Sequence, residues 1–183
     1  MRIIAGEHRG RRLSAPKGEA TRPTSDRARE GMFSTLQSLL DLEGARVLDL
    51  YAGSGALSLE AVSRGAGHAT LVDNDKAAVA ALTKNVALLA APATVVDADV
   101  HQFLRGHPSP YELVVIDPPY DSDVEPVLQL LEPWLAPGAV VVVERRTRGP
   151  EPQPPEWLVL DRSRRYGEAT LWYFRAAMRE GAE

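Results

Sequence analysis

The chain has 183 residues, a formal net charge of −4 and no cysteine. This length allows one domain with a proper hydrophobic core, and the missing cysteine argues against a disulfide framework, thiol chemistry and a zinc or iron–sulfur site. The four histidines have no metal-ligand spacing, and the longest apolar runs are far too short to span a membrane. We therefore expect a soluble cytoplasmic protein that binds no metal and no membrane.

The charge is divided unevenly along the chain. Residues 1–30 have a net charge of +4, whereas the remainder has −8. A basic arm on an acidic body is typical of a protein that binds nucleic acid through one segment, although a solvated tail would have the same composition. A short β-hairpin within a basic extension over residues 1–23 is predicted from the apolar residues Ile3, Ile4 and Leu13 together with Gly6 and Gly10. The hairpin would display three arginines, Arg9, Arg11 and Arg12.

Residues 24–183 are predicted to form the main domain. Thr24 suits the N-cap of a first helix that ends near Gly44, and two further apolar stripes at helical spacing cover residues 79–89 and 124–135. The expected strands are 47–50, 68–72, 94–97, 111–116 and 139–143, followed by an antiparallel pair, 158–161 with 170–175. Strands that are apolar on both faces and alternate with helices favour a mainly parallel sheet covered on both sides.

A glycine turn follows the strand at 47–50. Gly53 and Gly55 allow the backbone to turn tightly and to approach a ligand at a helix N-terminus. The pattern alone is weak, because Ser58 stands where a dinucleotide-binding fingerprint has Gly or Ala. Asp49 precedes the turn and suits a cationic group, such as a charged amino-acid moiety, better than a pyrophosphate.

Acidic residues also follow the next two strands. Asp73 comes about twenty residues after the turn, where a carboxylate accepts hydrogen bonds from both hydroxyls of a ribose. Asp75 is interpreted as the N-cap of the next helix. Asp99 follows the third strand and is placed either to accept from an adenine amine or to cap a loop.

The strand at 111–116 ends in the tetrapeptide Asp117, Pro118, Pro119 and Tyr120. The two prolines remove backbone donors, so the Asp117 carboxylate and the Pro118 carbonyl face outward as acceptors. A planar base with an exocyclic amine satisfies both acceptors and stacks on Tyr120. A proline-rich turn without a ligand is the plain alternative.

Acidic residues at successive strand ends, a glycine turn and an amine-accepting tetrapeptide form the layout of S-adenosylmethionine-dependent N-methyltransferases. The chain also resembles the RsmD family, whose members methylate the N2 amine of guanine 966 in bacterial 16S rRNA. The resemblance covers residues 2–175 and is carried by five segments: Arg2–Gly6, Arg9–Leu13, Thr21–Glu30, Asp49–Leu57 and Asp117–Tyr120. The chain has Tyr51, Asp73 and Tyr120 where the family often has Phe, Glu and Phe.

The resemblance implies a Rossmann-like class I methyltransferase, with a seven-stranded, mostly parallel sheet, helices on both faces and an N-terminal β-hairpin extension. S-adenosylmethionine would be the methyl donor, and no metal would be needed. The implied catalytic residues are Asp117, Pro118, Pro119 and Tyr120. The implied donor contacts are Asp49, Tyr51, Gly53, Ser54, Gly55, Asp73, Asn74, Asp99 and Val100.

The resemblance further implies a monomer that acts on 16S rRNA in the small ribosomal subunit or in an assembly intermediate. The arginines expected to contact rRNA phosphates are Arg9, Arg11, Arg12, Arg22 and Arg27. Arg22 and Arg27 have an alternative role, in which they orient the start of the first helix or pair with Glu30.

Other functions stay open from the sequence. The same tetrapeptide serves adenine-N6 methyltransferases of DNA or RNA and, with Asn in place of Asp117, enzymes that methylate a glutamine amide in protein. A nicotinamide-dependent oxidoreductase is disfavoured by Ser58 and by the lack of a proton-relay His or Tyr–Lys pair. A non-catalytic RNA-binding assembly factor is the remaining alternative.

Overall fold

The structure is a computed structural model, and it describes residues 1–16, 26–119 and 121–177. The helices within these ranges are α1 (Asp26–Leu36), α2 (Ala56–Ser63), α3 (Lys76–Leu89), α4 (Val100–Leu104) and α5 (Glu125–Leu130), with a 3₁₀ turn at Glu132–Trp134. The strands are β1 (Arg46–Leu50), β2 (His68–Asp73), β3 (Ala93–Asp97), β4 (Tyr111–Ile116), β5 (Leu135–Arg146), β6 (Leu158–Tyr166) and β7 (Ala169–Ala176).

The strands form one seven-stranded sheet in the order β3-β2-β1-β4-β5-β7-β6. The strands from β3 to β5 in this order are parallel, whereas β7 pairs antiparallel with β5 and with β6. The order reverses between β1 and β4, and in such sheets ligands bind beyond the carboxyl ends of the strands at the reversal. The predicted mostly parallel sheet and its closing antiparallel pair are confirmed.

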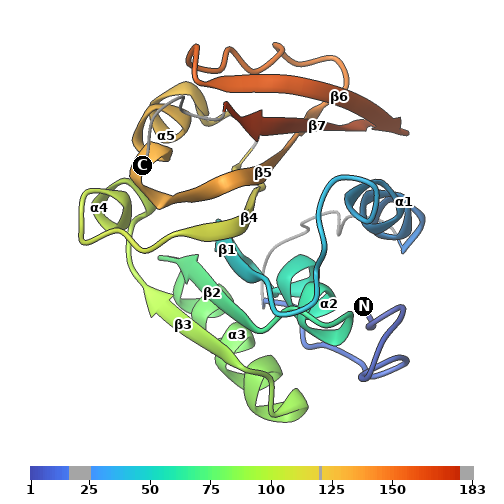
Figure 1. Cartoon of the computed structure of the whole chain (residues 1–183). Coiled ribbons are helices and arrows are strands. Elements are labelled where there is room, and N and C mark those ends of the chain that lie inside the picture. Colours follow the sequence, from blue (N-terminus) through green and yellow to red (C-terminus); the bar gives the residue numbers. More distant parts are fainter. Residues whose placement is uncertain (17–25, 120, 178–183) are drawn as a thin grey trace.

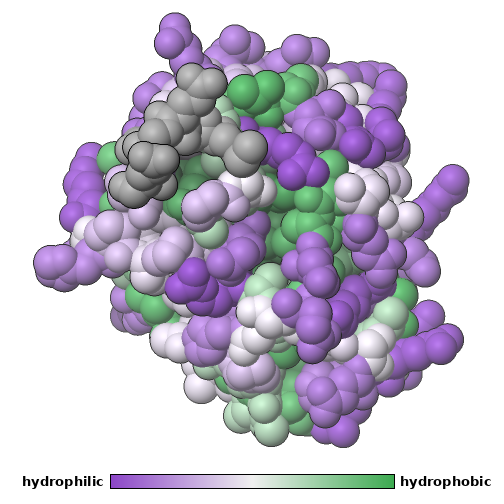
Figure 2. Space-filling view, viewed as in Figure 1, coloured by the Kyte–Doolittle hydropathy of each residue, from purple (hydrophilic) through white to green (hydrophobic). Residues whose placement is uncertain are grey.

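Helices cover both faces of the sheet. α4 and α5 lie on one side, and α1, α2 and α3 lie on the other (Figure 1). Phe33 of α1, Leu59 of α2 and Leu82 of α3 belong to one buried cluster, and Val100 of α4 and Leu128 of α5 belong to the second. Most of the face seen in Figure 2 is hydrophilic, with apolar residues in smaller patches. The sheet is therefore buried on both faces, as its apolar strands predict.

Two helices are shorter than the apolar stripes suggested. α1 ends at Leu36 instead of near Gly44, because the chain tightens there into i→i+3 turns, with the Leu39 N–H donating to the Leu36 carbonyl at 2.8 Å. α5 ends at Leu130, since Pro133 lies in the 3₁₀ turn that follows. The remaining apolar residues of both stripes still pack in or against the core, from turns and, for Leu135, from the start of β5.

β5 begins earlier than expected. The predicted strand started at residue 139, but the strand runs through Pro137 and Gly138 from Leu135. Its pairing with β4 shifts register between Tyr111 and Leu113. Proline inside a sheet is tolerated at such irregularities, because the ladder hydrogen bond it cannot make is already missing there.

The N-terminal loop, Met1–Ser14, packs against the domain. One antiparallel bridge joins Arg2 to Arg12, and Ile3 is fully buried. Glu60 of α2 is also fully buried and accepts hydrogen bonds from the backbone N–H groups of Ile4 (2.7 Å) and Ala5 (3.0 Å). The loop is thus fixed at its base, while a regular two-stranded hairpin remains a prediction. The proposed domain boundary at 23/24 lies outside the described residues.

β6 forms an outer edge of the sheet. Most of its side chains are exposed, including the apolar Val159 (54%) and Leu160 (46%). Three arginines, Arg162, Arg164 and Arg165, lie on the same strand.

No helix in the described ranges is long and apolar enough to cross a bilayer. The same residues contain no group of three potential metal ligands.

Candidate active site

Acidic residues gather at the carboxyl ends of the parallel strands. β1, β4 and β5 are in register up to Leu50, Ile116 and Val143, so the next residues, Tyr51, Asp117 and Glu144, continue one row across the sheet. Asp73 extends this row on β2, and Asp97 pairs with it on β3. Because side chains alternate along a strand, Asp49 faces the same side as this row. We call Asp49, Asp73, Asp117 and Glu144 the acidic row.

Asp49 is a buried carboxyl group, only 2% exposed. Burial raises its pKa to about 7; the hydrogen bond from the Ser58 hydroxyl opposes this shift and the charge of Asp73 adds to it. That hydroxyl donates to Asp49 Oδ2 at 2.7 Å. No ion pair links Asp49 to a basic side chain within the described part of the chain. A buried carboxylate that has no basic partner in its own chain suits a cationic ligand group.

The glycine turn has three left-handed residues, Tyr51 (φ 64°), Gly53 (φ 56°) and Gly55 (φ 73°). Tyr51 is not a glycine, so its backbone is strained, and such strain is concentrated at ligand-binding turns. The Gly53 N–H donates to Asp73 Oδ2 at 2.8 Å, which fixes the turn against β2. A Cβ atom added to Gly53 would meet nothing within 4 Å, so the turn borders open space where a ligand has room.

Asp73, Asp75 and Asp99 all have structural roles. Asp73 Oδ1 accepts from the Asp75 N–H at 2.9 Å, and Asp75 caps α3 by accepting from Ala78 N–H at 2.8 Å, as predicted. Asp99 caps α4 by accepting from Gln102 N–H at 3.0 Å. An ionised carboxylate has about four acceptor positions, so these bonds are compatible with the ligand roles expected of Asp73 and Asp99.

The remaining predicted donor contacts are close to these acids. Tyr51 is half-buried, and burial together with the nearby Asp99 charge raises the pKa of its phenol. Ser54 and Gly55 are buried within the turn, whereas Asn74 is exposed beside Asp73. Val100 is buried at the start of α4 and packs in the core.

Asp117 lies at the centre of the acidic row and is half-buried. Its backbone N–H points to the Leu50 carbonyl at 3.4 Å, which holds the start of the tetrapeptide beside β1. Burial raises the pKa of its carboxyl group well above the ordinary value, and the charges of Glu144 and Asp49 add to the shift. Pro118 is buried and Pro119 is exposed. Tyr120 lies outside the described residues.

The predicted RNA contacts are separate from the acidic row. Arg9, Arg12 and Arg27 are exposed. Arg11 is exposed too, but one of its Nη2–H groups donates to the Leu88 carbonyl near the end of α3 at 3.0 Å, so it also anchors the N-terminal loop. Arg22 lies outside the described residues.

Sequence reasoning missed the link between the N-terminal loop and the glycine turn. Asn85 of α3 is fully buried; its Nδ2 group donates to the carbonyls of Ser54 and Ser14, both at 2.9 Å, and its Oδ1 accepts from Ser14 N–H at 2.8 Å. A polar residue within the apolar stripe at 79–89 was the available signal. Ser58 was noted only as a departure from a dinucleotide fingerprint, although it holds Asp49.

Comparison with known proteins identifies the family. A family model described as "Conserved hypothetical protein 95" matches residues 1–175. The protein described as "Ribosomal RNA small subunit methyltransferase D" from Escherichia coli is 40% identical over 185 residues, which cover 98% of this chain and 92% of that protein. The chain belongs to this family, the RsmD family.

Two further comparisons agree. The protein of the same description from Haemophilus influenzae is 34% identical over 168 residues, covering 87% of this chain and 86% of that protein. A solved structure from Escherichia coli, provisionally described as a methyltransferase, has a TM-score of 0.87 and 36% identity and covers 98% of this chain and 99% of its own. The Rossmann-like methyltransferase fold expected from the motifs is therefore confirmed.

Proposed function

We propose that this RsmD-family protein methylates the N2 amine of a guanine in 16S rRNA of the small ribosomal subunit, with S-adenosylmethionine as methyl donor. The main observation in support of this proposal is the position of Asp117 in the acidic row, beside Glu144 and on the same face as buried Asp49. The names of the relatives support rRNA of the small subunit as the substrate. Guanine 966 is the family's target, and a cytoplasmic monomer is the form we expect to act.

The residues present fit S-adenosylmethionine. Asp49 suits the cationic amino group of the donor, Asp73 the ribose hydroxyls and Asp99 the adenine amine. The open space at the Gly53 backbone leaves room beside them. When bound, the donor supplies a methyl group attached to a positively charged sulfur.

The protein's own contribution is to bind and align the guanine. A base inside a stack is out of reach, so it must turn out at a free-energy cost of a few kcal/mol and stack on Tyr120. The lone pair of N2 is delocalised into the ring, which makes the amine a poor nucleophile. Asp117 and the Pro118 carbonyl accept its N–H bonds, favour a pyramidal nitrogen and direct its lone pair toward the methyl group. Most of the acceleration comes from this alignment, since displacement needs near-attack geometry. The nitrogen becomes positively charged as it gains the methyl group, and it then readily releases one of its two protons.

Donor binding is expected to release a proton from Asp49. Its folded-state pKa of about 7 means that the carboxyl group holds a proton below that pH, whereas a cationic ligand favours the ionised form. The raised pKa also makes the stability of the ligand-free protein depend on pH. The contribution of Asp49 to the free energy of unfolding is present at low pH and is lost as the pH rises from about 4 to about 7. Calorimetry at pH 6 in buffers of different ionisation enthalpy should show close to one proton released. Asp49→Asn should abolish the proton release. A binding enthalpy of the wild type that does not change with the buffer would contradict this prediction.

Arg9 and Arg12 are expected to contact rRNA phosphates. Replacing both with alanine should weaken subunit binding and reduce the slope of log affinity against log salt by about 1 for each arginine. Arg105→Ala is the control, because this arginine is exposed at the far end of α4. Equal salt slopes for the wild type and the double variant would show that these arginines do not contact rRNA phosphates.

The decisive test combines labelled S-adenosylmethionine with small subunits that lack the modification, followed by mass spectrometry of the nucleosides. N2-methylguanosine is the expected product. N6-methyladenosine would transfer the assignment to an adenine methyltransferase, and subunit binding without any methylated nucleoside would favour a non-catalytic assembly factor.

A further inference from the structure

Glu144 is the member of the acidic row that the proposed mechanism leaves without a role. It follows Val143 in β5, the register partner of Ile116, and so lies next to Asp117 on the neighbouring strand. Residues side by side on adjacent strands are about 4.8 Å apart, close enough for two carboxyl groups to face one bound molecule. Glu144 is only 6% exposed, and its charge acts directly on Asp117.

Guanine presents two hydrogen-bond donors side by side, the N1–H and the N2 amine. Adenine presents a bare acceptor, N1, beside its N6 amine. Ionised carboxylates only accept hydrogen bonds, so Asp117 and Glu144 match the donor pair of guanine when both are ionised, a state that the two hydrogen bonds from the base favour. At the same place, the N1 lone pair of adenine would face a carboxylate oxygen and leave it without a donor, which is unfavourable in a buried site.

We propose that Glu144 determines base specificity by accepting a hydrogen bond from N1–H of the target guanine, while Asp117 accepts from the N2 amine. The inference rests on the proposed function and deepens it, because it explains why this site takes guanine and not adenine. Glu144 has interactions within the folded chain. A carboxylate has about four acceptor positions, so it can keep them and accept this bond as well.

The test uses 2-aminopurine, which has the same amine at C2 as guanine but no hydrogen on N1. Methyl transfer is measured on small subunits whose rRNA carries either base at the methylated position. The wild type should prefer guanine by about 100-fold or more in kcat/KM, because sites built to bind an N–H group reject analogues that lack it. Glu144→Gln can donate as well as accept, so the preference should fall below about tenfold, with donor affinity unchanged.

Glu156→Gln is the matched control, because this glutamate is exposed in the loop before β6 and should keep the full preference. Glu144→Ala is a second variant, and melting temperature and donor binding show that each variant folds. If a folded variant transfers no methyl group, competitive binding of the two RNAs gives a dissociation constant for each. The ratio of these constants then measures the preference for guanine over 2-aminopurine.

Two results would overturn the role of Glu144: a folded variant that keeps the wild-type preference, or a wild type that accepts 2-aminopurine as readily as guanine. Failure of the proposed function is a different result. It is seen in the wild type alone, as the absence of methyl transfer to guanine.

Discussion

Replacing Asp117 with alanine is expected to lower the rate of methyl transfer by roughly 1000-fold and to leave donor affinity within a few-fold of the wild type. Alanine removes the acceptor that holds and orients the amine, whereas the residues expected to bind the donor lie on β1, in the glycine turn, at the end of β2 and at the start of α4. Asp117→Asn keeps one acceptor oxygen and should lose less activity. Single-turnover assays and calorimetric titration of the donor separate the two effects.

The same substitution should stabilise the ligand-free protein. The raised pKa of Asp117 means that its ionised form is less favourable in the folded protein than in water. Removing it should increase the free energy of unfolding near pH 8, by an amount on the order of 1 kcal/mol. A gain in stability with a loss of activity identifies a functional residue, whereas a loss of both would indicate that Asp117 mainly supports the fold.

Gly6→Ala is expected to detach the N-terminal loop and to destabilise the protein by on the order of 4 kcal/mol. A Cβ atom at Gly6 would lie 1.7 Å from the Ser63 carbonyl oxygen, a backbone atom that cannot move alone. Ser63 also holds the loop directly: its carbonyl accepts from Glu7 N–H at 2.8 Å and its hydroxyl accepts from His8 N–H at 2.9 Å. Denaturant unfolding measures the change.

Gly10→Ala is a matched control in the same loop. Gly6 and Gly10 have φ angles of 82° and 83°, so alanine introduces the same backbone strain at both positions, about 1–2 kcal/mol. Nothing lies within 4 Å of a Cβ atom at Gly10. Equal destabilisation by the two substitutions would show that docking against Ser63 contributes little. The Gly6 variant should also bind the small subunit less well, since Arg9 and Arg12 belong to the detached loop.

The fold was predictable from local patterns. Apolar strands alternating with helical stripes indicate a mostly parallel sheet, and this signal does not depend on exact boundaries. The boundaries were less accurate where tertiary contacts outweigh local signals. Pro137 and Gly138 favour a turn by composition, but they lie within β5 as an irregularity between two residues that pair with β4, Leu135 and Val140.

The site was predictable only in part. Asp75 was correctly interpreted as a helix cap because capping depends on neighbouring residues. The place of Glu144 directly beside Asp117 could not be predicted, because the two are far apart in the sequence and only the register between β4 and β5 brings them together. Glu60 and Asn85 were missed for the same reason: their partners, Ile4 and Ser14, lie more than 50 residues away.

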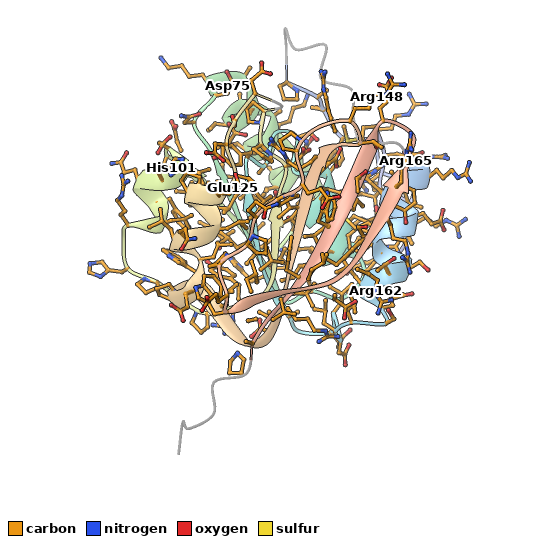
Figure 3. The ribbon with its side chains drawn as sticks, turned by 90° about the horizontal axis from the view of Figure 1, so that it is seen from above. Asp75, His101, Glu125, Arg148, Arg162 and Arg165 are labelled. Atoms are coloured by element: carbon orange, nitrogen blue, oxygen red, sulfur yellow. The ribbon has the colours of Figure 1, made fainter. Side chains whose placement is uncertain are left out.

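The exposed edge of β6 has a consequence for how the protein behaves in concentrated solution. An edge strand with Val159 and Leu160 in solvent offers unpaired backbone groups to a second molecule, and charged side chains along the strand are what discourage such pairing. In the view from above, Arg162 and Arg165 lie at different points along this edge, and Arg148 lies beyond β5 near Arg165 (Figure 3). Neutralising several of these arginines would promote self-association, so light scattering should accompany any mutagenesis of this strand.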